Sequence, residues 1–439
     1  SWKPLQGPAL CVYNNKPFTT QDLEGIQQLG DGSKRKDPCK TGKFGIGFSS
    51  VYHLTDVPSI MTNIDTGRVL CVFDPHCCYV PGADETAPGM QFSDLEYLKQ
   101  VFPDIFTGYM EDRFSMQDST MFRLPLRTKD MAEKSEISSK AISANFIEKM
   151  LKELRNEAKE MLLFLSHLEV IKISVIDING DCVDIGSFQA RLSDEDAVKR
   201  HIFHEEYMRV GSQLKSFDIS IAQVQQERIE YHLELSDETG KCERWHVNQI
   251  VGFTNPNQVG KHIIDAYAEG NLVQMPRGGV ACPLSKQHEG RVHCNLPMPL
   301  DTGLPVHING HFAMSFENRR FIWQKSGSYS GVKIEWNTLL CEDLIANAYV
   351  DMLKSVRHEF VGPSQVCPQV KEKLDLHGEL ARFEHVFPKL RSDESNEWQF
   401  LVKAVYSLIH FNQTPLFACI RDCGTKNCKV DKLMLLTST

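Results

Sequence analysis

The sequence of 439 residues has no apolar stretch near the ~20 residues that a membrane-spanning helix needs, and its first residues lack the hydrophobic region of a secretory signal. It also lacks an excess of positive charge, because 48 Lys and Arg stand against 57 Asp and Glu, a formal net charge of −9. A protein that coats nucleic acid normally carries a dominant basic face. We therefore expect no membrane contact and no nucleic-acid partner.

The spacing of cysteines that is typical of a zinc site is missing as well. The 14 cysteines include two clusters, and neither has C-x-x-C spacing with a second pair. Several others lie in apolar segments, which favours reduced thiols in the core and a cytoplasmic location. The two clusters are Cys77 with Cys78, and Cys419 with Cys423 and Cys428.

What is present is an ordinary globular composition, with 41% hydrophobic and 24% charged residues. At roughly 150 residues per domain, the length predicts about three domains. The sequence does not begin with Met, and we expect it to be excised from a longer chain.

Apolar periodicity predicts an N-terminal segment of mixed strands and helices. Residues 9–13 are typical of a buried strand, and a helix is expected from Thr20. Residues 69–73 and 120–126 also indicate strands. Between residues 146 and 165, apolar positions recur every three or four residues, which predicts a long amphipathic helix.

Beyond about residue 185 the pattern favours strands. Residues 229–235 alternate between apolar and polar and turn through 237–240 into a second strand, while Asn179-Gly180 marks an earlier hairpin. Helices are expected over 340–352 and 398–409. We predict three domains: residues 1–185, 186–357 and 358–439.

The most unusual local sequence is Gly42-Lys43-Phe44-Gly45-Ile46-Gly47-Phe48. Residues without Cβ let backbone N–H groups approach a phosphate, and the N-terminus of a following helix adds favourable partial charge. The same glycines could instead let a loop pack tightly on a helix with no ligand. No Lys-Ser or Lys-Thr follows, which excludes a Walker loop, and a basic loop rather than a strand precedes, which excludes a Rossmann fingerprint.

The order of strand, polar turn, helix, loop, glycine segment and later threonine-containing strand resembles the GHKL ATPase domain, specifically its heat-shock-protein-ninety branch. The resemblance covers roughly residues 8–178. It implies an α+β fold in which a Bergerat-type α/β sandwich, incomplete at its N-terminus, precedes a strand-rich middle-like domain and a small helical tail. It also implies that residues 42–48 contact the phosphates of ATP with magnesium, that residues 28–40 form the lid, and that Thr120 lies beside the adenine.

Two departures from that family point away from catalysis. The adenine-reading aspartate is replaced by Tyr13 or Asn14, and the glycines after it by Asn15 and Pro17, so the bond to the base loses its charge-assisted part. Only eight residues precede Ala9, too few for the family's first helix with its general-base glutamate and magnesium-binding asparagine. In-line hydrolysis then lacks water activation and charge neutralisation, and we expect no competent ATPase.

Two further groups have alternative interpretations. In related chaperones a middle-domain arginine reaches the terminal phosphate, so Arg319 and Arg320 are candidates for phosphate sensing, although pairing with carboxylates is the commoner role. His307 and His311 would share one face of a strand, but no third ligand is evident beside them. We expect no metal site.

Three longer motifs, at residues 5–15, 45–56 and 302–313, resemble the large repeats of the sacsin family in the same order. This resemblance spans residue 5 to about 353. It implies a chaperone-associated function in the cytoplasm, with protein clients, heat-shock chaperones and cytoskeletal filaments as partners.

We therefore predict a chaperone or co-chaperone module whose ATPase-like fold is degenerate and serves protein interaction. The alternative is a genuine ATP-binding and hydrolysing GHKL domain whose first helix is missing from this chain. The candidate nucleotide-binding residues are Asn14, Asn15, Gly42, Lys43, Phe44, Gly45, Ile46, Gly47, Phe48 and Thr120.

Overall fold

The computed structural model separates into two compact units, residues 1–154 and 155–439. Both combine helices with a β-sheet, so the predicted α+β class is confirmed. This division does not test the predicted domain limits at 185 and 357, which stay predictions. The structure describes residues 2–27, 37–39, 47–285, 288–314, 322–323, 330–361, 383–389, 398–414 and 416.

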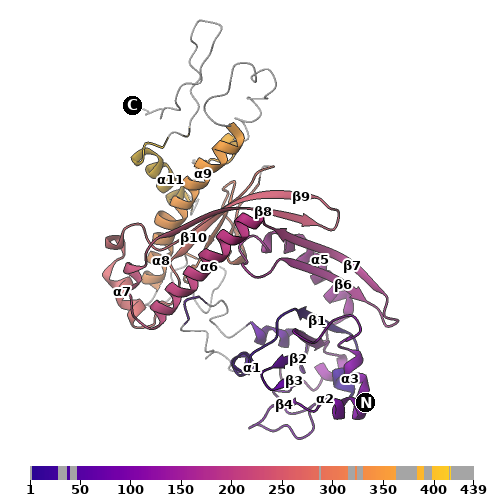
Figure 1. Cartoon of the computed structure of the whole chain (residues 1–439). Helices are drawn as coiled ribbons and strands as arrows, with labels where there is room; N and C mark the ends of the chain where they lie inside the picture. The colour runs from indigo at the N-terminus through magenta and orange to yellow at the C-terminus, as the bar shows by residue number, and fades with distance from the viewer. Residues whose placement is uncertain are drawn as a thin grey trace. The chain divides into compact units, whose positions relative to one another are not determined.

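The first unit is built on an antiparallel five-stranded sheet with the order β1-β5-β2-β3-β4 (Figure 1). The predicted strands at 9–13, 69–73 and 120–126 are confirmed within one or two residues at each end. The strands are β1 (Ala9–Asn14), β2 (Ser59–Ile64), β3 (Gly67–Phe73), β4 (Gly89–Phe92) and β5 (Thr120–Pro125).

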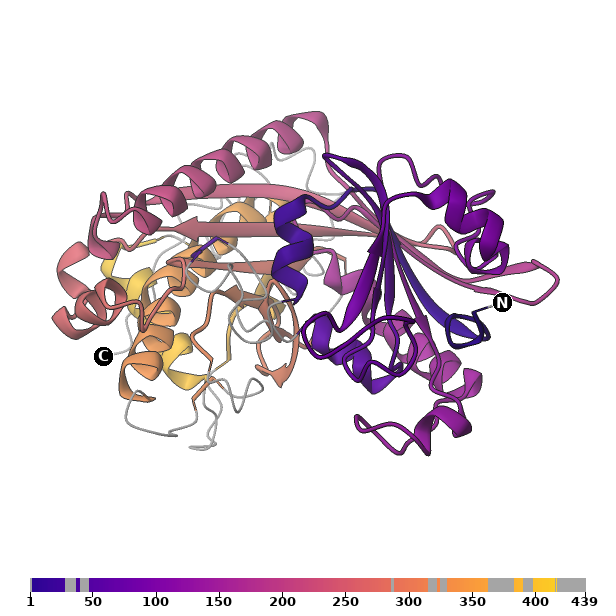
Figure 2. The same cartoon turned by 90° about the horizontal axis from the view of Figure 1, so that it is seen from below.

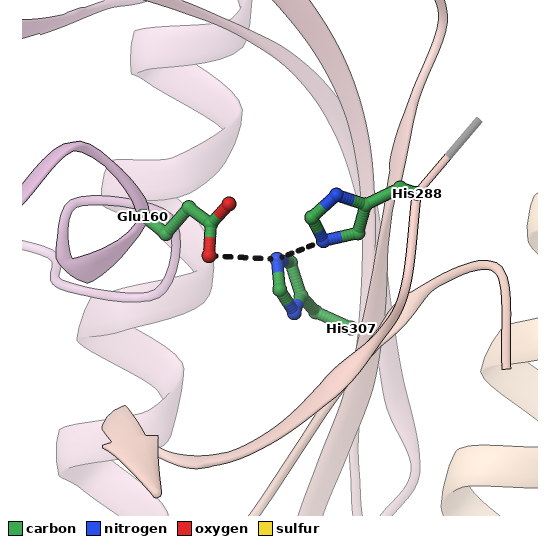
Figure 3. A group of neighbouring side chains, drawn as sticks. All are labelled: Glu160, His288 and His307. Carbon is green, nitrogen blue, oxygen red and sulfur yellow. Dashed lines mark hydrogen bonds and ion pairs between the residues drawn. The ribbon is translucent and has the colours of Figure 1, made fainter. Parts of the chain in front are cut away.

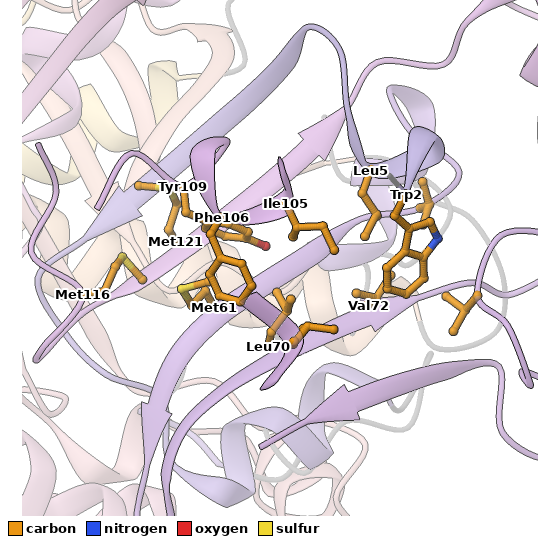
Figure 4. Packing of buried hydrophobic residues seen from close by; sticks show 13 residues of the cluster. Trp2, Leu5, Met61, Leu70, Val72, Ile105, Phe106, Tyr109, Met116 and Met121 are labelled. Carbon is orange, nitrogen blue, oxygen red and sulfur yellow. The ribbon is translucent and has the colours of Figure 1, made fainter. Parts of the chain in front are cut away.

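One face of this sheet carries the main hydrophobic cluster of the unit (Figure 4). Alternate residues of a strand point to opposite faces, and Met61, Leu70 and Met121 share this one. They pack against α2 (Leu95–Val101) and α3 (Pro103–Thr107), and each fully buried side chain of this size stabilises the fold by roughly 1.5–3 kcal/mol.

The opposite face is covered by α1 (Thr20–Gln27) and by the short 3₁₀ helix η2 (Phe48–His53). Leu23 of α1 packs on Val69 and Cys71 of β3. The helix that follows the glycine segment is thus a short 3₁₀ helix of six residues. Its first residue joins an aromatic group whose neighbouring ring centroids lie 5.1–6.2 Å apart. This group consists of Phe18, Phe48, Phe73 and Phe122.

A buried ion pair holds the end of η2 in place. Arg127, directly after β5, has a fully buried side chain, and its Nε donates to Asp56 Oδ1 at 2.5 Å. Its guanidinium also donates to the carbonyl oxygens of Tyr52 at 2.6 Å, Thr55 at 3.4 Å and Lys140 at 3.3 Å. The buried charge is therefore both paired and hydrogen-bonded, as burial requires.

The second unit contains an eight-stranded sheet with the order β12-β11-β13-β10-β9-β8-β7-β6, antiparallel except between β11 and β13. Both predicted hairpins are confirmed, with Gly180 and Gly240 in the left-handed conformation at their turns. The strands are β6 (Val170–Ile176), β7 (Cys182–Arg191), β8 (Glu227–Asp237), β9 (Cys242–Val251), β10 (Arg277–Pro283), β11 (Arg291–Cys294), β12 (Leu296–Asp301) and β13 (His307–Gly310).

Helices cover both faces of this sheet. Figure 2 shows the long magenta helix α6 on one side and the orange helices on the other. Even-numbered residues of β8 such as Arg228 and Glu230 face α9, and odd-numbered ones such as Tyr231 face the side of α6. The helices are α6 (Asp194–Lys215), α7 (Lys261–Ala268), α8 (Ser330–Leu339), α9 (Ala346–Val361) and α11 (Gln399–Phe411).

Two predicted helices differ from the prediction, one in its end and one in its hydrogen-bond pattern. The amphipathic helix is α5 (Ala144–Met161), which ends four residues earlier than 165 because Leu162 and Leu163 bond to carbonyls three residues back and tighten the last turn. The helix expected over 340–352 lies inside a longer one, in which the π-helical segment η5 (Leu340–Ile345) joins α8 to α9. The helix at 398–409 is confirmed as α11.

Among the described residues, no helix combines the length and apolar character needed to cross a membrane.

We expect Arg127→Met to lower the free energy of unfolding of the first unit by about 3–5 kcal/mol, because it leaves the carboxylate of Asp56 buried without its cation. Urea unfolding of the purified chain measures this. The matched control is Arg68→Met, which breaks a partly exposed pair with Glu111 and should cost about 1 kcal/mol or less. Equal losses for the two variants would contradict the assigned role of Arg127.

Candidate functional site

The structure brings together Asn14 and Thr120, two of the predicted nucleotide-binding residues. They are direct partners between β1 and β5, and Thr62 of β2 is the partner of Thr120 on its other side. Side chains of such partners share one face of a sheet. This is the face that α1 and Phe48 cover.

The strand register also places Tyr13 and Asn14, the two candidates for the position of the family's aspartate, on opposite faces of the sheet. Tyr13, one position before Asn14, points to the opposite face of the sheet. Its ring contacts Phe114 at a centroid distance of 5.1 Å, and its hydroxyl donates to the carbonyl oxygen of Ser115 at 3.0 Å. Tyr13 is thus part of the hydrophobic cluster, and Asn14 is the residue at the candidate site.

The polar groups at this site already have partners within the protein. Asn14 Oδ1 accepts the backbone N–H of Lys16 at 3.1 Å, and the Thr120 hydroxyl donates to the Lys16 carbonyl oxygen at 2.8 Å. The Thr120 and Thr62 hydroxyls lie 2.7 Å apart, and Thr62 Oγ1 accepts the N–H of Phe18 at 3.0 Å. Both threonines are fully buried. The side chains of Asn14 and Thr120, which the family resemblance assigns to adenine binding, therefore form hydrogen bonds with the turn after β1.

Of the remaining candidates, the structure describes only a part. Asn15 is exposed in the turn after β1, and Gly47 precedes Phe48 at the start of η2. The φ of Gly47 is −56°, a helical value that any residue adopts, so conformation does not require glycine there. The predicted lid is described only at residues 37–39. Outside the described residues lie Gly42, Lys43, Phe44, Gly45, Ile46, Arg319 and Arg320.

A second group of chemically active side chains lies in the second unit (Figure 3). It consists of Glu160 on α5, His307 on β13, and His288, which precedes β11. The Nε2 atom of His307 therefore does have partners of ligand type, and these are Glu160 and His288 rather than His311. His307 Nε2 lies 2.7 Å from His288 Nε2 and 3.4 Å from Glu160 Oε2. Sequence spacing carries no signal for this group, because its members come from three distant segments.

The hydrogen bonds of His307 decide what this group can do. Its Nδ1 accepts the backbone N–H of Arg291 at 3.0 Å. In the neutral ring the proton is then on Nε2, which has no lone pair left for a metal ion. The ring is fully buried and stacks on Trp245 at a centroid distance of 5.3 Å. We interpret this group as a hydrogen-bonded chain that links α5 to β13.

The surroundings of Glu160 shift its ionisation strongly. Burial alone would raise the pKa of this carboxyl, but the hydrogen bond with His307 and the charges of His307, His288 and Arg291 outweigh burial and lower the pKa to about 2. The ionised form of Glu160 is thus stabilised in the folded chain.

Comparison with known proteins shows which sequences the chain is similar to. Residues 1–183 match the family model of the Sacsin domain. The chain is also 39% identical to human sacsin over 427 residues, an alignment that covers 96% of this chain. The chain corresponds to a sacsin repeat region. The predicted resemblance to the sacsin repeats is confirmed, and the chain spans about 9% of the length of the curated relative that it matches.

In this sacsin-type region the Thr62 and Thr120 hydroxyls should be energetically coupled. We expect Thr62→Val and Thr120→Val each to cost about 1–3 kcal/mol, because each leaves a buried polar partner unsatisfied. The double variant should cost less than the sum of the two by at least about 0.5 kcal/mol. Urea unfolding of the four proteins gives this coupling, and strict additivity would contradict it.

The ionisation of Glu160 in the sacsin-type region predicts a pH dependence. Its folded-state pKa of about 2 lies below the ordinary value of 4.5, so the stabilisation is present above pH ~4.5 and is lost as the pH falls toward 2. The difference in unfolding free energy between the wild type and Glu160→Gln should be present at pH ~4.5 and narrow as the pH falls toward 2. Denaturant unfolding at several pH values measures it, and a difference that grows on acidification would contradict the assignment.

Proposed function

We propose that this chain is a chaperone or co-chaperone module in which an ATPase-like fold serves protein contacts rather than ATP turnover. The correspondence with a sacsin repeat region supports this role. As the GHKL resemblance implies, the first part would be a Bergerat-type sandwich and the second a middle-like domain with a helical tail. The proposed partners are protein clients, heat-shock chaperones and cytoskeletal filaments in the cytoplasm.

The observation that carries the proposal is that Asn14 and Thr120 form hydrogen bonds within the protein. In GHKL relatives the aspartate at this strand end reads the adenine, whereas here Asn14 and Thr120 both hold the backbone of Lys16. A base that displaced this turn would take the Lys16 carbonyl away from the buried Thr120 hydroxyl, at a cost of about 1–3 kcal/mol, whereas the bond of Asn14 is exposed and adds less. Since 1.4 kcal/mol is a factor of ten in affinity, the cost at Thr120 alone weakens binding by about 5-fold to 140-fold.

The alternative is an ATP-binding domain, with ATP and magnesium as cofactors, that is completed by residues outside this chain. One observation speaks for it: Asn14, Thr120 and Phe48 share one face of the first sheet, as the parts of one site must. Titration of the chain with nucleotide separates the two functions.

We expect no saturable heat when the chain is titrated calorimetrically with Mg-ATP to about 1 mM, a limit that detects binding free energies near −4 kcal/mol. The variant Asn14→Asp restores the family's carboxylate. It should still accept the N–H of Lys16, so we expect it to bind no ATP either. Saturable micromolar binding by the wild type that tightens in Asn14→Asp would support the alternative instead.

The chaperone role has a separate readout. The chain should slow the heat-induced aggregation of an unfolding client protein equally with and without ATP, because contact with the client does not depend on the nucleotide. Bovine serum albumin at equal concentration controls for crowding. No effect on aggregation in either condition would contradict the chaperone proposal, whatever the titration shows.

A further inference from the structure

Three side chains of metal-binding type meet on one face of the eight-stranded sheet, separate from the groups described above. His232 of β8 and His246 of β9 are direct partners in the antiparallel register, and Glu359 reaches them from α9. Glu359 Oε1 contacts His232 Nε2. His246 Nδ1 lies 3.1 Å from His232 Nε2 and 3.6 Å from Glu359 Oε1. The three donor atoms thus surround a single point.

The position of Glu359 follows from matched spacing between helix and strand. Arg228 of β8 pairs with Asp351 of α9, and the Ser355 hydroxyl donates to Glu230 at 2.5 Å. Four residues of helix advance about 6 Å, and two residues of strand advance about 6.6 Å. The next position of this row therefore sets Glu359 against His232. Three regular elements hold the group, which favours a pre-arranged site over an accidental contact.

No placement of the ring protons gives a hydrogen bond to each of the three close contacts in this group. The three donor atoms define three edges, and each neutral imidazole has one N–H. If both ring protons point inward, both can be donated to Glu359, but two N–H groups then face each other across the 3.1 Å between the rings. If one proton points inward, at least one edge has no hydrogen. A cation at the centre would satisfy all three lone pairs at once.

The surroundings of His232 favour a lone pair on its inward nitrogen. Asp196 Oδ2 accepts the backbone N–H of His232 at 3.2 Å and lies 4.0 Å from His232 Nδ1. At this distance the carboxylate accepts no hydrogen bond from Nδ1, but its negative charge favours a proton there and a lone pair on Nε2. His246 is 1% exposed and directs Nδ1 into the group. This differs from His307, whose Nδ1 accepts a backbone N–H.

We propose that His232, His246 and Glu359 bind a divalent transition-metal ion of the zinc class. Two imidazole nitrogens and one carboxylate oxygen suit this ion, which commonly takes water as its fourth ligand. The His232 and Glu359 side chains are 30% and 26% exposed, so the fourth position is open to solvent. Arg244 contacts the other oxygen of Glu359, Oε2, at 3.9 Å and leaves Oε1 for the ion. The bound ion would join β8 and β9 to the last turns of α9.

The test is metal affinity of the full chain after removal of metal with a chelator. We expect one Zn²⁺ per chain to compete successfully with a chromophoric chelator, and one Co²⁺ to give the visible absorption of a four- or five-coordinate site. Glu359→Gln and His246→Gln should each weaken this binding by at least about 100-fold, because each removes a ligand atom. Zn²⁺ should raise the melting temperature of the wild type but not of Glu359→Gln.

The chain offers a matched control in its other group of two histidines and a glutamate. Glu160→Gln should leave metal affinity unchanged, because Nε2 of His307 carries a proton. Metal-free circular dichroism establishes that the variants fold. Wild-type affinity no greater than that of Glu359→Gln, or a loss of binding in Glu160→Gln that equals the loss in Glu359→Gln, would overturn the proposal. Neither result depends on nucleotide binding or chaperone activity.

Discussion

The buried ion pair between Arg127 and Asp56 is the interaction on which the first unit depends most. A short helix exposes unpaired carbonyl groups at its end, and burial makes each of them costly. The guanidinium meets this requirement by donating hydrogen bonds to the carbonyl oxygens of Tyr52 and Thr55, while Asp56 neutralises its charge. The end of β5 thereby fixes η2, and with it the ring of Phe48, on the face of the sheet where Asn14 and Thr120 lie.

At the candidate nucleotide site the polar side chains make hydrogen bonds within the protein. Strand alternation still places an amide and a hydroxyl side by side at the ends of β1 and β5. Both groups now hold the backbone of Lys16, so the strand-end turn has become an internal structural element.

The local sequence pattern predicted most strands and helices, because strand alternation and hairpin turns depend on residues that are neighbours in the sequence. The hairpin centred on Thr239 even sets His232 opposite His246, since both are equally distant from the turn. No local signal brings Glu359 to them, or Glu160 and His288 to His307, because these contacts depend on how helices pack on the sheet. The helix end at Met161 was also beyond prediction, since apolar spacing continues through Leu162 and Leu163 after the winding changes.

The π-helical segment η5 has a consequence for the helix that follows it. A π turn acts as one inserted residue, and one residue rotates a helix by about 100°. Asp343 within this segment is fixed by the backbone N–H and hydroxyl of Thr254, at 2.7 and 2.5 Å, so the rotation is anchored where it arises. The segment η5 therefore determines which face of α9 lies against the sheet. Removing a single residue from η5 would rotate α9 about its axis and turn the side chains of Asp351 and Glu359 away from the sheet, while α9 itself stays helical.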